Sequence, residues 1–138
     1  MLNKLLEKIK NGELLSLKLF NNLDEDTALD MRDRLEFEDE WLRVSNILDE
    51  IKVDSKNDEL IYEIRKHSFI NVYNITKSDE LSAYISDDFE LISKAIVLEY
   101  NDKWLNSLIL SYANFKFPYI ISELTNLSIN EVTNKLIY

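Results

Sequence analysis

The 138-residue chain contains no cysteine and has only one glycine, one proline and one histidine. Without cysteine there is no disulfide framework, no thiolate metal site and no cysteine nucleophile. A single glycine excludes the glycine-rich phosphate loops and the dinucleotide-binding fingerprint, which need several glycines. Glycine and proline also mark the turns between strands, so their scarcity argues against an all-β protein.

The sequence also shows no hydropathy pattern typical of a signal peptide or a membrane-spanning helix. The first residues, Met1 to Lys8, carry charges from the start and hold no apolar run of signal-peptide length. The most apolar window, Trp104 to Ile121, is interrupted by polar side chains and by Pro118, and it falls short of the roughly 18 apolar residues of a membrane span. We therefore expect a cytoplasmic protein without a membrane partner.

The apolar residues that are present recur at spacings of three and four, which is the pattern of amphipathic helices. The sequence predicts an all-α fold: one compact domain, residues 1–138, with about seven to nine helices, mostly in antiparallel pairs. We expect these helices at 2–10, 13–20, 24–53, 58–73, 79–85, 87–100, from 102 to before Pro118, 118–124 and 128–136.

Two segments allow alternatives. In 24–53 the apolar stripe changes phase, with Ala28 and Met31 on one side and Trp41 and Val44 nearly opposite. Either the helix breaks near Glu36–Glu40, or one long helix packs against two neighbours; the phase change favours a break or kink. The alternating residues 71–76 are also consistent with a short extended piece.

Capping patterns indicate where the later helices begin. Asp87 with Glu90 and Ser128 with Glu131 both have the spacing of a capping box, so each pair is predicted to open a helix. Together with the preceding helix, the second box gives residues 121–136 a likeness to a DNA-binding helix-turn-helix. The presumed recognition helix offers Lys135 as its single base, so a plain helical hairpin is favoured.

The net charge of −10 is concentrated in one region. Between Asp24 and Glu63 there are 15 acidic and 5 basic residues, a balance of −10, while the rest of the chain holds 11 of each. Such a region is either a solvated face or a docking surface for a basic partner. It also argues against a nucleic-acid partner, because binding a polyanion needs a concentrated basic face.

Within this region, five acids recur at spacings of three and four, so a continuous helix would carry them on one face. These predicted partner-binding residues are Asp26, Asp30, Asp33, Glu36 and Glu40. The secondary candidates lie around the loops expected where the helices 87–100 and 118–124 begin, and are Asp87, Asp88, Phe115, Phe117 and Tyr119.

No pattern identifies a catalytic centre. His67 has Glu63 four residues before it but no nucleophile elbow to serve, and is expected at the surface. Glu36-x-x-Asp39 fits one carboxylate unit of all-α nucleotide pyrophosphohydrolases, but Glu59 and Glu63 depart from the second unit and no basic set for the phosphates is visible. We expect no catalytic residue, metal, cofactor or small-molecule substrate, and keep a metal-dependent hydrolase and a general regulatory or interaction domain as alternatives.

The segment from Ser86 to Pro118 is similar in style to helical immunity proteins of contact-dependent growth-inhibition and related polymorphic-toxin systems. It begins Ser86-Asp87-Asp88-Phe89, passes through Asn101-Asp102-Lys103-Trp104 and ends Phe117-Pro118. The resemblance covers about a quarter of the chain and carries over no family residue. It implies a protein that binds and blocks a toxin domain, commonly a basic nuclease, which an acidic inhibitor would complement.

Overall fold

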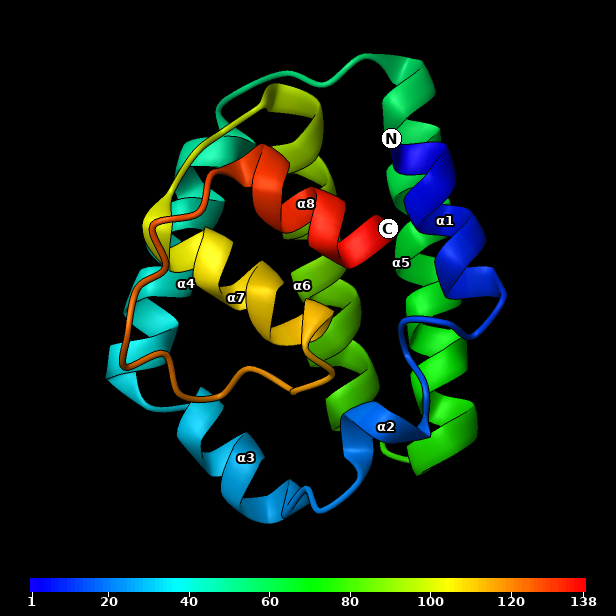
Figure 1. Cartoon of the computed structure of the whole chain (residues 1–138), viewed down its shortest axis with the longest axis vertical. Helices are drawn as coiled ribbons and strands as arrows, with labels where there is room; N and C mark the ends of the chain where they lie inside the picture. Colours follow the sequence, from blue (N-terminus) through cyan, green and yellow to red (C-terminus); the bar gives the residue numbers. More distant parts are fainter.

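A computed structural model describes residues 1–138 and contains eight α-helices and no β-strand, which confirms the all-α prediction (Figure 1). The helices are α1 (Leu2–Lys10), α2 (Leu17–Phe20), α3 (Glu25–Arg32), α4 (Leu35–Asp49), α5 (Ser55–Thr76), α6 (Asp79–Leu98), α7 (Lys103–Ala113) and α8 (Ile129–Ile137). None of them is both long and apolar enough to cross a membrane.

Helix α6 is the centre of the fold. It forms a hairpin with α5 through the two residues Lys77 and Ser78, and it also contacts α1, α3, α4 and α8. Figure 1 shows α1 and α5 on one side of α6, α4 on the other, and α7 with α8 across it. Phe89 and Ile92 of α6 are fully buried within a core of 31 apolar residues, and the ring of Phe89 lies 4.9 Å from that of Tyr112.

The predicted break in the acidic region is confirmed, but it lies at Asp33–Arg34 instead of at Glu36–Glu40. Helix α3 buries Ala28, Leu29 and Arg32, and α4 buries Phe37, Val44 and Leu48. These two buried faces are out of phase in the sequence. The extended backbone at Arg34, with φ −74° and ψ 148°, lets both face the core. Helix α4 ends at Asp49, so the expected extension to Val53 is wrong.

Helices α5 and α6 are longer than predicted. Residues 71–76 belong to α5, where Val72 is buried and the side chain of Asn71 donates a hydrogen bond to the carbonyl of Ile9 on α1, so the extended alternative is wrong. Helix α6 runs without interruption through Asp87, which is therefore not the N-cap of a new helix. The capping-box spacing of Asp87 and Glu90 was misleading because both residues lie in the middle of a continuous and largely buried helix.

The segment 114–128 contains no helix, so the helix predicted at 118–124 is wrong, and so are the helix-turn-helix and the helical hairpin that required it. Its backbone is held by the rest of the fold: the N–H of Thr125 donates to Ser107 Oγ at 2.9 Å. The second capping box is confirmed, since Ser128 Oγ accepts from the N–H of Glu131 and the Glu131 carboxylate accepts from the N–H of Ser128. The helix predicted at 13–20 forms only over α2.

The residue after α6 offers a test of local backbone strain. Glu99 ends this helix with φ 51° and ψ 38°, a left-handed conformation that costs a residue with a Cβ about 1–2 kcal/mol. Replacing it by glycine, Glu99→Gly, should raise the free energy of unfolding by up to about 1 kcal/mol, because the greater freedom of glycine in the unfolded chain offsets part of the gain. Urea denaturation measures the change. Glu99→Ala removes the same charge but keeps the Cβ, and an equal stabilisation by alanine would contradict the strain argument.

Candidate partner-binding surface

An ion pair in the interior fixes the junction between α3 and α4. Arg32, the last residue of α3, donates from its two terminal nitrogens to the two carboxylate oxygens of Asp88 in α6, at 2.9 Å and 2.8 Å. The side chains of Arg32 and Asp88 are 3% and 0% exposed. This bidentate geometry is the strongest arrangement that arginine and a carboxylate can adopt.

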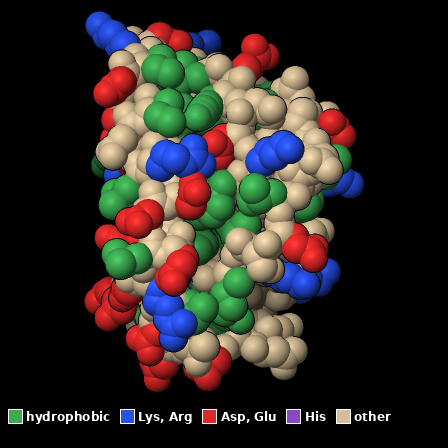
Figure 2. Space-filling model, turned by 90° about the vertical axis from the view of Figure 1, so that its left-hand side faces the viewer, with side chains coloured by type: hydrophobic (Ala, Val, Ile, Leu, Met, Phe, Trp, Pro, Cys, Tyr) green, Lys and Arg blue, Asp and Glu red, His purple; other side chains and the backbone are tan.

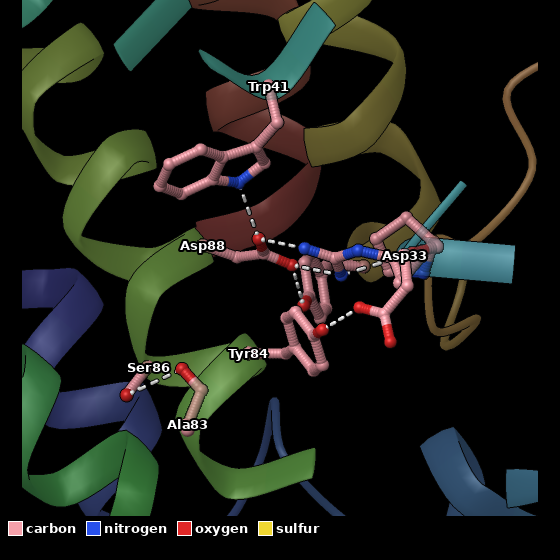
Figure 3. A network of polar contacts seen from close by, with 9 residues as sticks. Asp33, Trp41, Ala83, Tyr84, Ser86 and Asp88 are labelled. Atoms are coloured by element: carbon pink, nitrogen blue, oxygen red, sulfur yellow. Dashed lines mark hydrogen bonds and ion pairs between the residues drawn. The ribbon is translucent and has the colours of Figure 1, made fainter. Parts of the chain in front are cut away.

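Three more groups complete this buried polar network (Figure 3). Asp88 also accepts from Trp41 Nε1 of α4 at 2.9 Å and from the hydroxyl of Tyr112 of α7 at 2.6 Å. Arg32 donates further to the carbonyl oxygen of Pro118 at 3.2 Å. One site thereby joins α3, α4, α6, α7 and the segment 114–128.

The ionisation of the network follows from its pairing. Burial alone would lower the pKa of Arg32, but the charge and the hydrogen bonds of Asp88 outweigh burial and raise it, so the guanidinium stays charged. Burial, with the negative charge of Asp88, raises the pKa of Tyr112 well above its ordinary value, so its hydroxyl remains a donor. Three aromatic rings surround the guanidinium, those of Phe37, Tyr84 and Phe117, at 4.3, 5.0 and 5.2 Å. Within this network, Arg32 Nε is the one buried polar atom that has no hydrogen-bond partner.

Because the helix breaks after Arg32, the predicted acidic residues are divided between two helices. Asp26 and Asp30 are exposed on α3, Asp33 lies at the break, and Glu36 and Glu40 lie on α4. The expected single helical face is therefore wrong, because the chain changes direction after Arg32 to bury that side chain.

The five acids also differ in what they contact. Glu40 accepts from Arg43 Nε at 2.5 Å, whereas the other four form no ion pair. Asp33 accepts from the hydroxyl of Tyr84, and this hydrogen bond, with burial, raises the pKa of Tyr84 to about 12. Asp26, Asp30 and Glu36 are thus exposed without an ion pair.

The secondary candidates for partner binding differ in how far their side chains are buried. Asp88 and Phe117 are buried, which leaves neither side chain exposed to a partner. Asp87 is half-buried and pairs with Arg65 of α5 at 2.6 Å, and burial raises the pKa of Asp87 despite that pairing. Phe115 and Tyr119 are half-buried.

Sequence reasoning missed the apolar side chains that accompany the acids. Leu35 at the start of α4 is 70% exposed, and Ile120 and Leu124 are 56% and 54% exposed. A cavity of about 270 Å³ between these segments is lined by Glu36, Trp104 and Ile120 among others, so the segment 114–128 lies against the α3–α4 junction. Figure 2, which looks at the side of the molecule with α4 in Figure 1, shows apolar side chains between acidic and basic ones. Ile120 and Leu124 belong to the helix wrongly predicted at 118–124, and their exposure follows from the absence of that helix.

The structure contains no assembled metal site for the alternative of a metal-dependent hydrolase. The structure contains no group of three or more His, Asp and Glu side chains that could hold a metal ion. The carboxylates considered for a pyrophosphohydrolase therefore do not converge. His67 Nε2 lies 3.4 Å from Glu63 Oε2 on the same face of α5, as the spacing of four residues predicted.

A second polar link joins α4 to α7. Arg43 donates to both oxygens of Asp102 at 2.8 and 3.2 Å, while Asp102 also caps α7 by accepting from the N–H of Leu105 at 3.0 Å. Burial alone would raise the pKa of Asp102, but these hydrogen bonds outweigh it and lower the pKa below its ordinary value of 3.8.

Comparison with models of protein families identifies a match to this chain. The model of the family described as "Immunity protein PIM1" matches residues 4–119, which include most of α1, all of α2 to α7 and the whole buried network. No curated protein sequence matches the chain.

The buried pair predicts a large effect on stability. Asp88→Asn keeps the shape of the side chain but leaves the buried charge of Arg32 uncompensated, so the free energy of unfolding should fall by about 3–5 kcal/mol. The matched control is Asp49→Asn, which breaks an exposed pair with Lys94 at 2.8 Å and should cost less than about 1 kcal/mol. Chemical denaturation compares the two variants, and similar small losses would contradict the structural role of Asp88.

The link between Arg43 and Asp102 predicts a pH dependence. Because the pKa of Asp102 is lower in the folded chain than in the unfolded chain, its contribution is present above pH 3.8 and is lost as the pH falls through the folded pKa. Asp102→Asn retains a good helix cap but does not titrate, so its unfolding free energy should fall less steeply between about pH 4 and 2. The control Asp39→Asn changes an exposed carboxylate outside any ion pair and should keep the wild-type slope. Equal slopes in all three proteins would refute the assignment.

Proposed function

The chain belongs to the immunity protein PIM1 family, and from this premise we propose that it neutralises a basic toxin domain, a nuclease, by binding it in a one-to-one complex. The setting we propose is the bacterial cytoplasm, within a contact-dependent growth-inhibition or related polymorphic-toxin system. The function is inhibition by contact and requires no catalytic group of its own.

The observation that carries this proposal is the position of the charge. The whole net charge of −10 lies between Asp24 and Glu63, which the fold places in α3, α4 and the first part of α5. A nuclease binds a polyanion and therefore presents basic groups around its active site. Attraction between oppositely charged surfaces steers association and raises its rate.

The pairing of the bases strengthens this argument. Of the five basic residues in the acidic region, Arg32 is bound to Asp88 and Arg43 to Asp102, and both acids lie outside the region. Neither base is therefore available to neutralise Asp26, Asp30 or Glu36. Asp26, Asp30 and Glu36 are exposed and form no ion pair, so they can meet an external cation, whereas Glu40 and Asp49 of α4 are paired within the chain.

The surface also has the composition of an interface. Protein interfaces combine an apolar centre with a polar rim. Leu35 at the start of α4 and Ile120, which lines a cavity together with Glu36, supply exposed apolar area beside the acids of the α3–α4 junction. We propose that the acids set the rate of association while these side chains contribute to the lifetime of the complex.

A double charge reversal tests the proposal. Asp30→Lys with Glu36→Lys should slow association with the toxin domain encoded beside this chain by about tenfold or more at low salt, because it removes attraction from the steering surface. Surface plasmon resonance at low and high salt measures this rate. The difference should shrink at high salt, since screening shortens the reach of the charges to about 8 Å at physiological ionic strength and less above it.

The matched control makes the same change in net charge elsewhere. Glu7→Lys with Glu99→Lys alters two exposed acids outside the acidic region and should slow association much less. If both double variants behave alike, net charge alone acts and the α3–α4 surface is not the docking site. If the wild-type chain does not bind the toxin domain, the proposed function fails.

A further inference from the structure

A cavity of about 180 Å³ lies between the α3–α4 junction and α6, above the buried network. Three aromatic residues, Phe37, Trp41 and Tyr84, form part of its wall, with Leu42 at 43% exposure beside them. Trp41 and Tyr84 are held in place from behind, since Trp41 donates to Asp88 and Tyr84 donates to Asp33. The walls are therefore fixed before any ligand arrives.

The charges of this cavity do not cancel. Three carboxylates line it, those of Asp33, Glu38 and Asp87, together with one cation, Arg32. The charge of Arg32 is already matched by Asp88 behind it. Of the three acids, only Asp87 has a basic partner, Arg65. The cavity thus joins an aromatic interior to an excess of negative charge.

We propose that this cavity receives an arginine side chain of the toxin, as the anchor of the complex inferred above; the inference rests on the proposed function. A guanidinium stacks flat on an aromatic face, and Trp41 is the ring of this cavity that Arg32 does not already contact. Its fork of N–H donors reaches carboxylates at the rim, and Glu38 is the exposed one that has no partner within the chain. Anchors of this kind, seated in preformed pockets, carry most of the energy of an interface.

Titration with a small arginine compound tests the cavity without the toxin. The probe is N-acetyl-arginine methylamide, and the readout is the pair of indole N–H signals in the NMR spectrum, because the chain has two tryptophans. The signal of Trp41 should shift with saturation at millimolar probe. The signal of Trp104, which is 6% exposed and does not line this cavity, should remain in place. N-acetyl-leucine methylamide should not saturate the Trp41 shift, and a Trp41 signal that responds equally to both compounds overturns the proposal.

Two neighbouring positions of α4 provide a matched pair of variants. Glu38 lines the cavity and Asp39 does not, yet both are exposed acids outside any ion pair. Glu38→Gln should weaken binding of the arginine compound about two- to fivefold, the range for one partly exposed ion pair, and Asp39→Asn should leave it unchanged. Equal effects of the two substitutions contradict a bound guanidinium.

The same pair separates this inference from the proposed function. In the toxin complex, Glu38→Gln should raise the dissociation rate, whereas Asp39→Asn should alter only the salt-dependent association rate. If wild-type protein binds the toxin and both variants dissociate at the same rate, the anchor is wrong and the proposed function stands. If the arginine compound binds in the cavity but the toxin does not bind the chain, the proposed function is wrong and the cavity remains a guanidinium site.

Discussion

The rest of the structure depends on the burial of Arg32 against Asp88. Removing two charges from water is expensive, and the pair is tolerable only because hydrogen bonds satisfy most of what remains. Asp88 receives two donors from Arg32 and one each from Trp41 and Tyr112, and Arg32 also reaches the carbonyl of Pro118. These partners come from four helices and one extended segment, so satisfying the pair requires all five to meet. The α3–α4 junction, the cavity and the exposed acids take their positions from that meeting.

Such a contact matters most where apolar burial is sparse. Helix α6 buries ten residues, and it packs against α1 and α5, with Arg65 of α5 adding ion pairs to Asp87 and Glu90. Helices α3 and α4 bury three residues each, and one of the three in α3 is the charged Arg32. The acidic part of the molecule is therefore attached largely through polar links: Arg32 to Asp88, Arg43 to Asp102 and Lys94 to Asp49. Directional links of this kind specify one arrangement, whereas apolar contacts would permit several.

The sequence was informative where local rules and burial agreed, and uninformative where a distant partner decided. The helical class, the bounds of α1 and the cap of Ser128 follow from periodicity and side-chain chemistry alone. Asp87 was predicted to start a new helix because its spacing to Glu90 is that of a capping box, and nothing nearby reveals that Arg32, 56 positions before Asp88, binds Asp88 inside the protein. The acidic surface was visible as composition. The cavity was not, since it combines Trp41 and Tyr84 from helices that only the fold brings together.

Exposed like charges oppose folding, and this chain keeps them apart without neutralising them. Carboxylates three or four positions apart on one helix repel each other by a few tenths of a kcal/mol per pair. The break at Asp33–Arg34 divides Asp26 and Asp30 from Glu36, so the longest run of such pairs is interrupted. Of the bases near these acids, Arg32 is directed into the core and Arg43 to Glu40 and Asp102, and Arg34 at the break forms no ion pair. A partner rich in basic groups would relieve the remaining repulsion as it binds, and the chain would then gain stability from the complex as well as affinity. The unpaired acids are thus a disadvantage to the isolated chain that binding a cationic partner would convert into a source of binding energy.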